Sequence, residues 1–196
     1  KLTNIWEKAL ENQNYQEDHQ IEIRSAAIKD MSCNYTYELW VGKTKGDVMK
    51  KRTGAQIIHE DLDKAFKELD VFLAHIDGAF TSFANNQTPI QDLEADEVLS
   101  NYVVNGFKIS GSDENKSVII SGFKETGYGI IHFDTPKIKL NSTYLYVEEL
   151  EERLNVALNE VEEYMNGKTA PQFEQLEINF DATQENEDDF QNAKID

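Results

Sequence analysis

The residues best suited to binding chemistry in this sequence are five basic side chains that closely follow three aromatic ones. The chain has 37 acidic and 19 basic residues, yet five of the basic ones fall between positions 43 and 52. Positive side chains neutralise phosphates, and aromatic rings stack on unpaired bases whatever the base sequence. The pattern therefore predicts a surface for single-stranded nucleic acid. Its contact residues are Tyr35, Tyr37, Trp40, Lys43, Lys45, Lys50, Lys51 and Arg52.

The same stretch also has an interpretation that needs no ligand. Between Cys33 and Val41, apolar and aromatic residues alternate with polar ones, which predicts a β-strand that ends in a turn at 42–46. Strands are rich in aromatic residues because these side chains pack well on a pleated surface. The tyrosines then belong to the core and the basic residues to the tip of a hairpin. The sequence leaves the two interpretations open.

No catalytic or cofactor motif is complete in the sequence. Residues 41–44 (VGKT) look like the end of a phosphate-binding loop, but Tyr37 stands where such a loop needs a glycine. The four histidines are too scattered for a zinc site, and the acidic cluster at 92–97 lacks the glycine of a calcium loop. We therefore expect a protein that is not an enzyme and that holds neither a metal nor a cofactor.

Charge and composition restrict the partners of the chain. The formal net charge is −18 over 196 residues, which argues against coating duplex DNA with the whole surface and against an anionic membrane partner. No apolar run is long enough to span a membrane, and the single Cys33 suits a reducing compartment. The polar N-terminal residues do not have the pattern of a signal peptide, so none is expected in the given sequence. We expect a cytoplasmic protein with a small basic site on an acidic body.

Two helices are predicted from stripes of apolar residues at helical spacing. The first covers residues 62–80, and the second covers about 146–166 and ends at Gly167, a favoured residue after a helix. The first stripe consists of Leu62, Phe66, Leu69, Leu73, Ile76 and Phe80. The second stripe consists of Val147, Leu150, Leu154, Ala157, Val161 and Tyr164.

A run of strands lies between the two helices. Strands are predicted at about 102–111, 117–124, 128–133 and 137–140, joined by short polar turns, so neighbours should pair antiparallel as a meander. The resulting class is α+β, an antiparallel meander sheet packed on one face by the two amphipathic helices. The other face of the sheet is left free for solvent, a partner or a ligand.

Three segments follow from this layout. Residues 31–168 form one α+β domain, and residues 1–30 form a polar N-terminal arm or short helix. Residues 169–196 form an acidic tail, which we expect to be disordered because it cannot bury enough apolar area to fold. The two apolar stripes could also meet across a dimer interface, so a homo-oligomer is a further expectation.

The C-terminal end carries six acidic residues from Asp181 onward, with Phe190 directly after Asp188 and Asp189. This layout resembles the acidic tails of bacterial and phage single-stranded DNA-binding proteins. The resemblance implies that the tail recruits partner proteins and competes with DNA for a basic groove. Asp188, Asp189 and Phe190 are the residues that it implies for partner binding.

A second resemblance covers more of the chain. It rests on the segment 58–62 (IHEDL) that opens a striped helix, on the repeated Ile-Ser-Gly of the 109–122 hairpin, and on 162–168 (EEYMNGK). This order looks like that of uncharacterised tailed-phage and prophage proteins. The resemblance implies the cytoplasm of a bacterial host and adds no catalytic residue.

Three functional hypotheses follow, and the first is a nucleic-acid-binding accessory protein, for single-stranded DNA, with a partner-recruiting acidic tail. The alternative is an acidic interaction or decoy protein of phage origin, a DNA mimic or an inhibitor of a host factor. Its basis is an acidic helix face that could imitate a row of phosphates. That face carries Glu148, Glu149, Glu151, Glu152, Glu160, Glu162 and Glu163. The third hypothesis is a virion or assembly component, which the sequence neither favours nor opposes.

Overall fold

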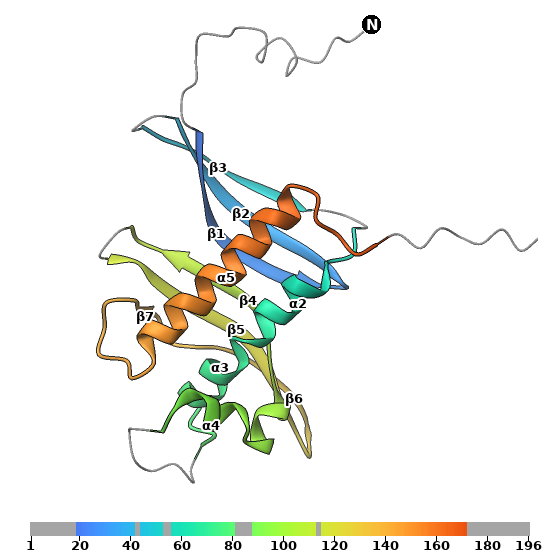
Figure 1. Ribbon diagram of the computed structural model, residues 1–196, viewed down its shortest axis with the longest axis vertical. Helices are drawn as coiled ribbons and strands as arrows, with labels where there is room; N and C mark the ends of the chain where they lie inside the picture. Colours follow the sequence, from blue (N-terminus) through green and yellow to red (C-terminus); the bar gives the residue numbers. More distant parts are fainter. Residues whose placement is uncertain (1–18, 42–43, 53–55, 81–87, 113–114, 172–196) are drawn as a thin grey trace, which may run out of the picture.

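A single sheet and the helices that cover one of its faces make up the described chain in this computed structural model (Figure 1). It describes residues 19–41, 44–52, 56–80, 88–112 and 115–171. The strands are β1 His19–Lys29, β2 Ser32–Val41, β3 Thr44–Arg52, β4 Tyr102–Ser110, β5 Ser117–Thr126, β6 Gly129–Asp134 and β7 Ile138–Lys139. The helices are α2 Glu60–Lys67, α3 Asp70–Ile76, α4 Ile90–Glu94, the 3-10 helix η1 Glu97–Asn101 and α5 Val147–Met165. The predicted α+β class is confirmed.

Two antiparallel meanders build the sheet, in the order β3-β2-β1-β4-β5-β6. The meanders meet where β1 pairs with β4, over a short ladder that aligns Ser25 with Lys108 and Ala27 with Gly106. The predicted meander from β4 to β6 is confirmed. β7 differs from its prediction, because it pairs with the first residues of β5 and does not extend the meander.

The N-terminal arm predicted for residues 1–30 is wrong over residues 19–29, which form the central strand β1. A bulge at Arg24 interrupts the alternation expected of a strand. The charges of this strand are also paired rather than solvated. Arg24 Nη2 donates to Glu22 Oε2 at 2.7 Å and to Glu38 Oε2 at 2.8 Å. The polar composition of β1 therefore reflects a partly buried ion cluster on the sheet.

Strand β3 replaces the predicted turn at its described positions, 44–46. It runs antiparallel to β2 to the end of the basic stretch, so the basic residues of 44–52 belong to an edge strand. At the other end of the domain, Thr169 forms a bridge with Ile58. Residues 169–171 thus belong to the folded part, and the rest of the predicted acidic tail lies outside the described residues.

The first predicted helix is divided into α2 and α3. The amide of Phe72 donates to the carbonyl of Leu69 at 3.1 Å, so the carbonyl of Glu68 lacks the partner that a continuous helix would supply. Arg153 of α5 supplies it, since its Nη1 donates to that carbonyl at 3.0 Å. A contact with the second helix therefore accompanies the break, which the apolar spacing alone does not show. The apolar stripe stays in the core on both sides of it.

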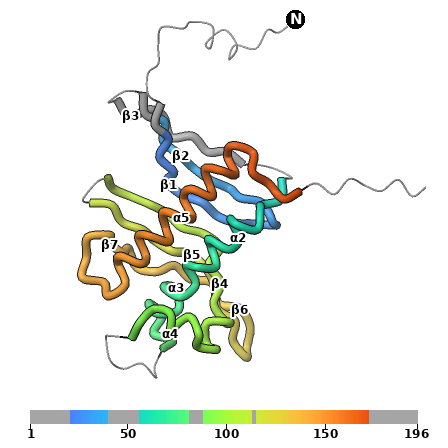
Figure 2. The backbone as a smooth tube through the Cα atoms, in the orientation of Figure 1, coloured from blue at the N-terminus to red at the C-terminus, as the bar shows by residue number. Residues whose placement is uncertain are grey.

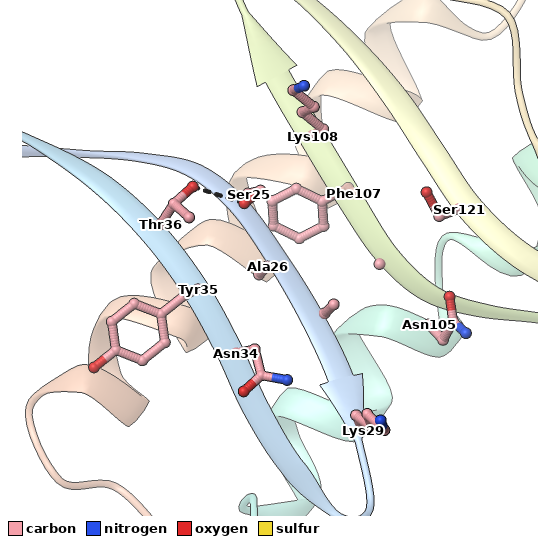
Figure 3. Close-up of a pocket in the computed structure, with 12 residues that line it drawn as sticks. Ser25, Ala26, Lys29, Asn34, Tyr35, Thr36, Asn105, Phe107, Lys108 and Ser121 are labelled. Carbon is pink, nitrogen blue, oxygen red and sulfur yellow. Dashed lines mark hydrogen bonds between the residues drawn. The ribbon is translucent and has the colours of Figure 1, made fainter. Parts of the chain in front are cut away.

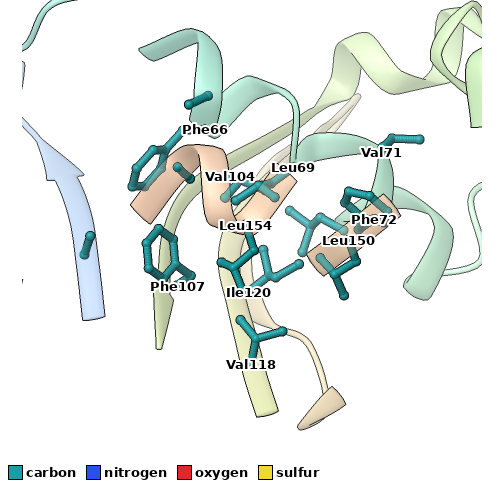
Figure 4. Packing of buried hydrophobic residues seen from close by; sticks show 14 of the residues in the cluster. Phe66, Leu69, Val71, Phe72, Val104, Phe107, Val118, Ile120, Leu150 and Leu154 are labelled. Atoms are coloured by element: carbon teal, nitrogen blue, oxygen red, sulfur yellow. The ribbon is translucent and has the colours of Figure 1, made fainter. Parts of the chain in front are cut away.

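The core lies between the covered face of the sheet and helices α2, α3 and α5 (Figure 4). Phe66 of α2 packs against Phe107 of β4, with ring centroids 5.4 Å apart. In α5, the side chains of Leu150 and Leu154 have no exposed surface. The apolar stripe of α5 is thus used within the chain, so it does not form the dimer seam that its spacing allowed.

Asp70 at the start of α3 makes stability depend on pH. Its Oδ1 accepts a hydrogen bond from the amide of Val104 at 2.6 Å, and burial raises the pKa of its carboxyl to about 7. The folded state then binds more protons than the unfolded state between about pH 4 and pH 7, so stability falls as the pH rises through that window. Asp70→Asn keeps the acceptor and removes the titration.

We compare the free energy of unfolding of Asp70→Asn with that of the wild type. As the pH rises from about 5 to about 8, we expect this difference to shift by about 2 kcal/mol in favour of the variant, after a discount for partial exposure. Urea unfolding of both proteins across that range measures the difference, and subtraction cancels the titration of the other carboxylates. If the difference in the free energy of unfolding between the two proteins is the same at about pH 5 and at about pH 8, Asp70 is not a buried group that stays protonated in this range.

Met31 occupies an unfavourable backbone conformation at the turn between β1 and β2. Its φ is 62° and that of Asp30 is 50°, in the left-handed region that glycine adopts most readily. The Met31 side chain is 64% exposed, so little packing is lost when it is removed. Met31→Gly should therefore raise the free energy of unfolding by about 1 kcal/mol. A midpoint of urea unfolding at or below that of the wild type would show that the turn is not strained.

Candidate functional site

A groove of about 600 Å³ lies on the face of the sheet that the helices leave open. It follows the junction of the two meanders, where β1 pairs with β4 (Figure 3). Its floor is made of small residues from three strands, namely Ser25, Ala27, Gly106 and Ser121. Its walls include Asn34, Thr36 and Asn105. The hollow exists because small side chains lie in a row at the centre, with longer ones on both sides.

The position of Gly106 explains why the floor is low. A Cβ atom at this glycine would lie 3.3 Å from the Cβ of Ala27, its partner in register. Both residues therefore face the groove, and neither carries more than a methyl group there. A ligand can approach the backbone of β1 and β4 closely at this point.

Lys29 and Lys108 give the groove a positive charge. In Figure 3 they lie at opposite ends of it. Lys108 is aligned with Ser25, and Lys29 stands four residues further along β1, about 13 Å along the strand direction. None of the described residues that line the groove is acidic, and neither lysine forms an ion pair with another residue in that part of the chain. An acidic protein thus has an electropositive groove on its open face.

Neutral polar groups in the groove could bind a ligand by hydrogen bonds. Ser25 Oγ and Thr36 Oγ1 lie 2.7 Å apart and bond to each other (Figure 3). The Oδ1 atom of Asn34 is buried and has no hydrogen-bond partner among the described residues.

An aromatic pair extends the open face beyond the groove. Phe123 stands two residues after Ser121 on β5, hence on the same face, and is aligned with the exposed His132 of β6. The two ring centroids are 5.5 Å apart. The sequence alone already predicts that Phe123 and Ser121 lie on the same face of their strand, because they stand two residues apart. The link to a basic site was missed because that site is assembled from two separate hairpins.

Tyr35 and Tyr37 do not face the groove with their rings, which corrects their predicted role in stacking. Tyr35 is 2% exposed, and its ring meets that of Tyr164 edge-on at 6.4 Å. Tyr37 is half-buried against the core on the same, helix-covered side. The strand alternation was right, but these aromatic residues lie on the face that α5 covers. Their rings are therefore not available for unpaired bases.

The remaining predicted contact residues are placed only by strand register. Lys50 is aligned with Thr36 and Arg52 with Asn34, so these two positions adjoin the wall of the groove. Lys51 is aligned with the buried Tyr35. The register also aligns Lys45 with Trp40. Lys43, Asp188, Asp189 and Phe190 lie outside the described residues.

The acidic face of α5 is interrupted in its middle. Glu148, Glu151 and Glu152 are exposed near the start of the helix, and Glu162 and Glu163 near its end. Exposed Asn155 and Asn159 stand between, so about 15 Å of the helix carries no exposed carboxylate. Phosphates of duplex DNA follow one another far more closely, at about 3.4 Å of axis per strand. The spacing fits a solvated helix better than a phosphate row.

Within the described part of the chain, no group of three or more His, Cys, Asp or Glu side chains is placed to hold a metal ion. None of the described helices is both long and apolar enough to cross a membrane.

Comparisons with known proteins add no functional assignment. No protein-family model matches the chain, and no curated protein or solved structure is significantly similar to it. The resemblance to phage proteins therefore stays a prediction. The function has to be argued from the geometry of the open face.

Proposed function

We propose that the protein binds single-stranded nucleic acid, with single-stranded DNA as the expected ligand, through the groove on the open face of its sheet. The observation that carries the proposal is the pair Lys29 and Lys108 in a groove whose described lining holds no acidic residue, in a chain of net charge −18. If the acidic residues of the chain were spread evenly over its surface, some of their carboxylates would line this groove. A local reversal of charge favours a ligand that is an anion.

A single strand fits this surface better than a duplex. The two lysines lie about 13 Å apart along the strand direction, a spacing that suits phosphates of one extended strand. Phe123 and His132 lie further along the same face, where a base can stack on an aromatic ring. A duplex would bring a second row of phosphates against an acidic body, which is unfavourable.

The proposed binding mode assigns a role to each group. Lys29 and Lys108 neutralise phosphates, and the small residues of the floor leave room for sugars and bases. Lys50 and Arg52, at register positions beside the groove, add further positive charge. The acidic end with Asp188, Asp189 and Phe190 recruits a partner protein, in the cytoplasm of a bacterial host.

Fluorescence anisotropy with labelled oligothymidylate tests the proposal. At about 50 mM salt we expect saturable binding that weakens as salt is added, with a log–log slope of only about −1.5 to −3, because few phosphates are neutralised. The same sequence as a duplex should bind at least about tenfold more weakly. Absence of binding at low salt would exclude the proposed function, and equal affinity for the duplex would exclude a single-strand site.

A further inference from the structure

A second, apolar groove of about 560 Å³ lies where the turn between β1 and β2 meets the start of α2. Its apolar lining comes from Ile28, Met31, Ile57 and Ile58. Three segments form it: the turn between β1 and β2, the start of α2 and the chain that follows α5. Figure 2 shows these three segments side by side. Met31 is 64% exposed and Ile57 is 47% exposed. Two large apolar side chains thus remain in contact with water in one hollow.

Backbone hydrogen bonds hold this groove in shape. The amide of Ile58 donates to the carbonyl of Met31 at 2.9 Å, and the amide of Ala170 donates to the carbonyl of Ile57 at 3.0 Å. A bridge between Ile58 and Thr169 lies next to them. The exposed apolar side chains therefore stand on a rigid frame and are preformed for a partner.

The backbone at Met31 supports a role for its side chain. A φ of 62° is unfavourable for any residue with a Cβ atom, and glycine would relieve the strain. The chain has instead a long, flexible and polarisable apolar side chain at this point, a type that adapts well to a bound surface. Strain together with exposure of an apolar group is the pattern of a binding site.

The charges beside the groove indicate which partner it fits. Glu60 and Asp63 line it, and the exposed Asp30 lies next to Met31. Asp63 also pairs with Lys67 at 2.6 Å, which leaves Glu60 and Asp30 as the less compensated charges. No lysine or arginine is among the described residues that line this groove. The surface is apolar in the middle and negative at the rim.

We propose that this groove binds a segment of a partner protein in which apolar side chains alternate with or lie between lysines or arginines. The apolar side chains contact Met31 and Ile57, and the basic ones face Glu60 and Asp30. The inference is independent of nucleic-acid binding, because it uses no residue of the open-face groove. The partner's positive charge distinguishes it from the C-terminal end of this chain, whose apolar Leu176, Ile178 and Phe180 are interspersed with acidic residues.

A fluorescein-labelled peptide of alternating leucine and lysine tests the proposal on the full chain. We expect saturable binding by anisotropy, and at least about tenfold weaker binding to Met31→Gly and to Ile57→Ser. Because Met31→Gly relieves strain, its loss of affinity cannot come from unfolding. Asp30→Asn combined with Glu60→Gln should weaken binding about threefold, and more at low than at high salt. Val156→Ser, at an exposed apolar position of α5, should change nothing.

Matched peptides define the results that overturn the proposal. A leucine and glutamate peptide that binds as tightly would show plain apolar adhesion, and full affinity of Met31→Gly would place the site elsewhere. Absence of binding to the wild type also overturns it. Nuclear Overhauser contacts from Ile178 or Phe180 to the Met31 methyl group would mean that the chain fills its own groove. A dimer that Met31→Gly dissociates in sedimentation would identify a second copy as the occupant.

Discussion

Gly122→Ala is expected to lower the free energy of unfolding by about 3 kcal/mol, at the upper end of the cost of overpacking a core. A Cβ atom at Gly122 would lie 2.3 Å from the carbonyl oxygen of Val103 and 2.6 Å from Cδ2 of Leu73. The first contact is with the backbone of the neighbouring strand, which cannot move without breaking the β4–β5 ladder. The second is with α3, so a shift would also separate the helix from the sheet.

Gly127→Ala is the matched control for this prediction. Gly127 lies in the turn between β5 and β6, and a Cβ atom there would meet nothing within 4 Å. Its substitution should leave stability within about 0.5 kcal/mol or raise it slightly, because alanine restricts the unfolded chain. Urea unfolding followed by far-ultraviolet circular dichroism measures both variants. Similar losses for the two glycines would contradict the close packing assigned to Gly122.

The elements predicted correctly are those whose pattern is local and regular. The strict alternation from Cys33 to Val41 and the stripe of α5 each repeat over many residues, so both elements are visible without tertiary information. The β4 to β6 meander follows from short polar turns. In these regions local preference and tertiary burial agree, which is the condition under which pattern analysis succeeds.

The elements missed are those in which tertiary contacts override the local pattern. β1 contains Glu22 and Arg24 and a bulge, and its charges are compensated by Glu38 on another strand. The end of α2 coincides with a hydrogen bond to the carbonyl of Glu68 from Arg153, which lies 85 residues further along the chain. Neither feature leaves a local periodic signal, because each depends on a partner far along the chain.

The sequence predicts a basic surface at positions 35–52, whereas the two lysines of the proposed groove stand at positions 29 and 108. The sequence also predicts that one face of the sheet is free, and alternation shows which residues share a face, but it does not assign the basic surface to either face. Alternation does not reveal which face the helices cover, and Tyr35 lies on the covered one. Lys29 and Lys108 meet in one groove only through the pairing of β1 with β4. That pairing joins two meanders that are separated in the sequence by helices α2, α3 and α4 and the 3-10 helix η1.

Lys29→Glu combined with Lys108→Glu is expected to weaken the binding of single-stranded DNA by at least about 100-fold, roughly tenfold for each reversed charge. Each substitution replaces attraction for a phosphate with repulsion, in a groove where the other described lining residues carry no charge. The log–log salt slope should also become shallower by about 1.4, since two phosphates are no longer neutralised. Anisotropy titrations with oligothymidylate at several salt concentrations measure both quantities.

Lys64→Glu separates a local effect from a change in net charge. Lys64 is exposed on α2, a helix of the covered face, and its reversal alters the net charge as much as either groove substitution does. Its affinity for oligothymidylate should stay within about twofold of the wild type, because a charge beyond a Debye length of about 8 Å is screened at physiological salt. Equal losses from Lys64→Glu and Lys108→Glu would mean that only the overall charge matters. The groove would then not be the binding site, and the ligand would have to be sought on another surface.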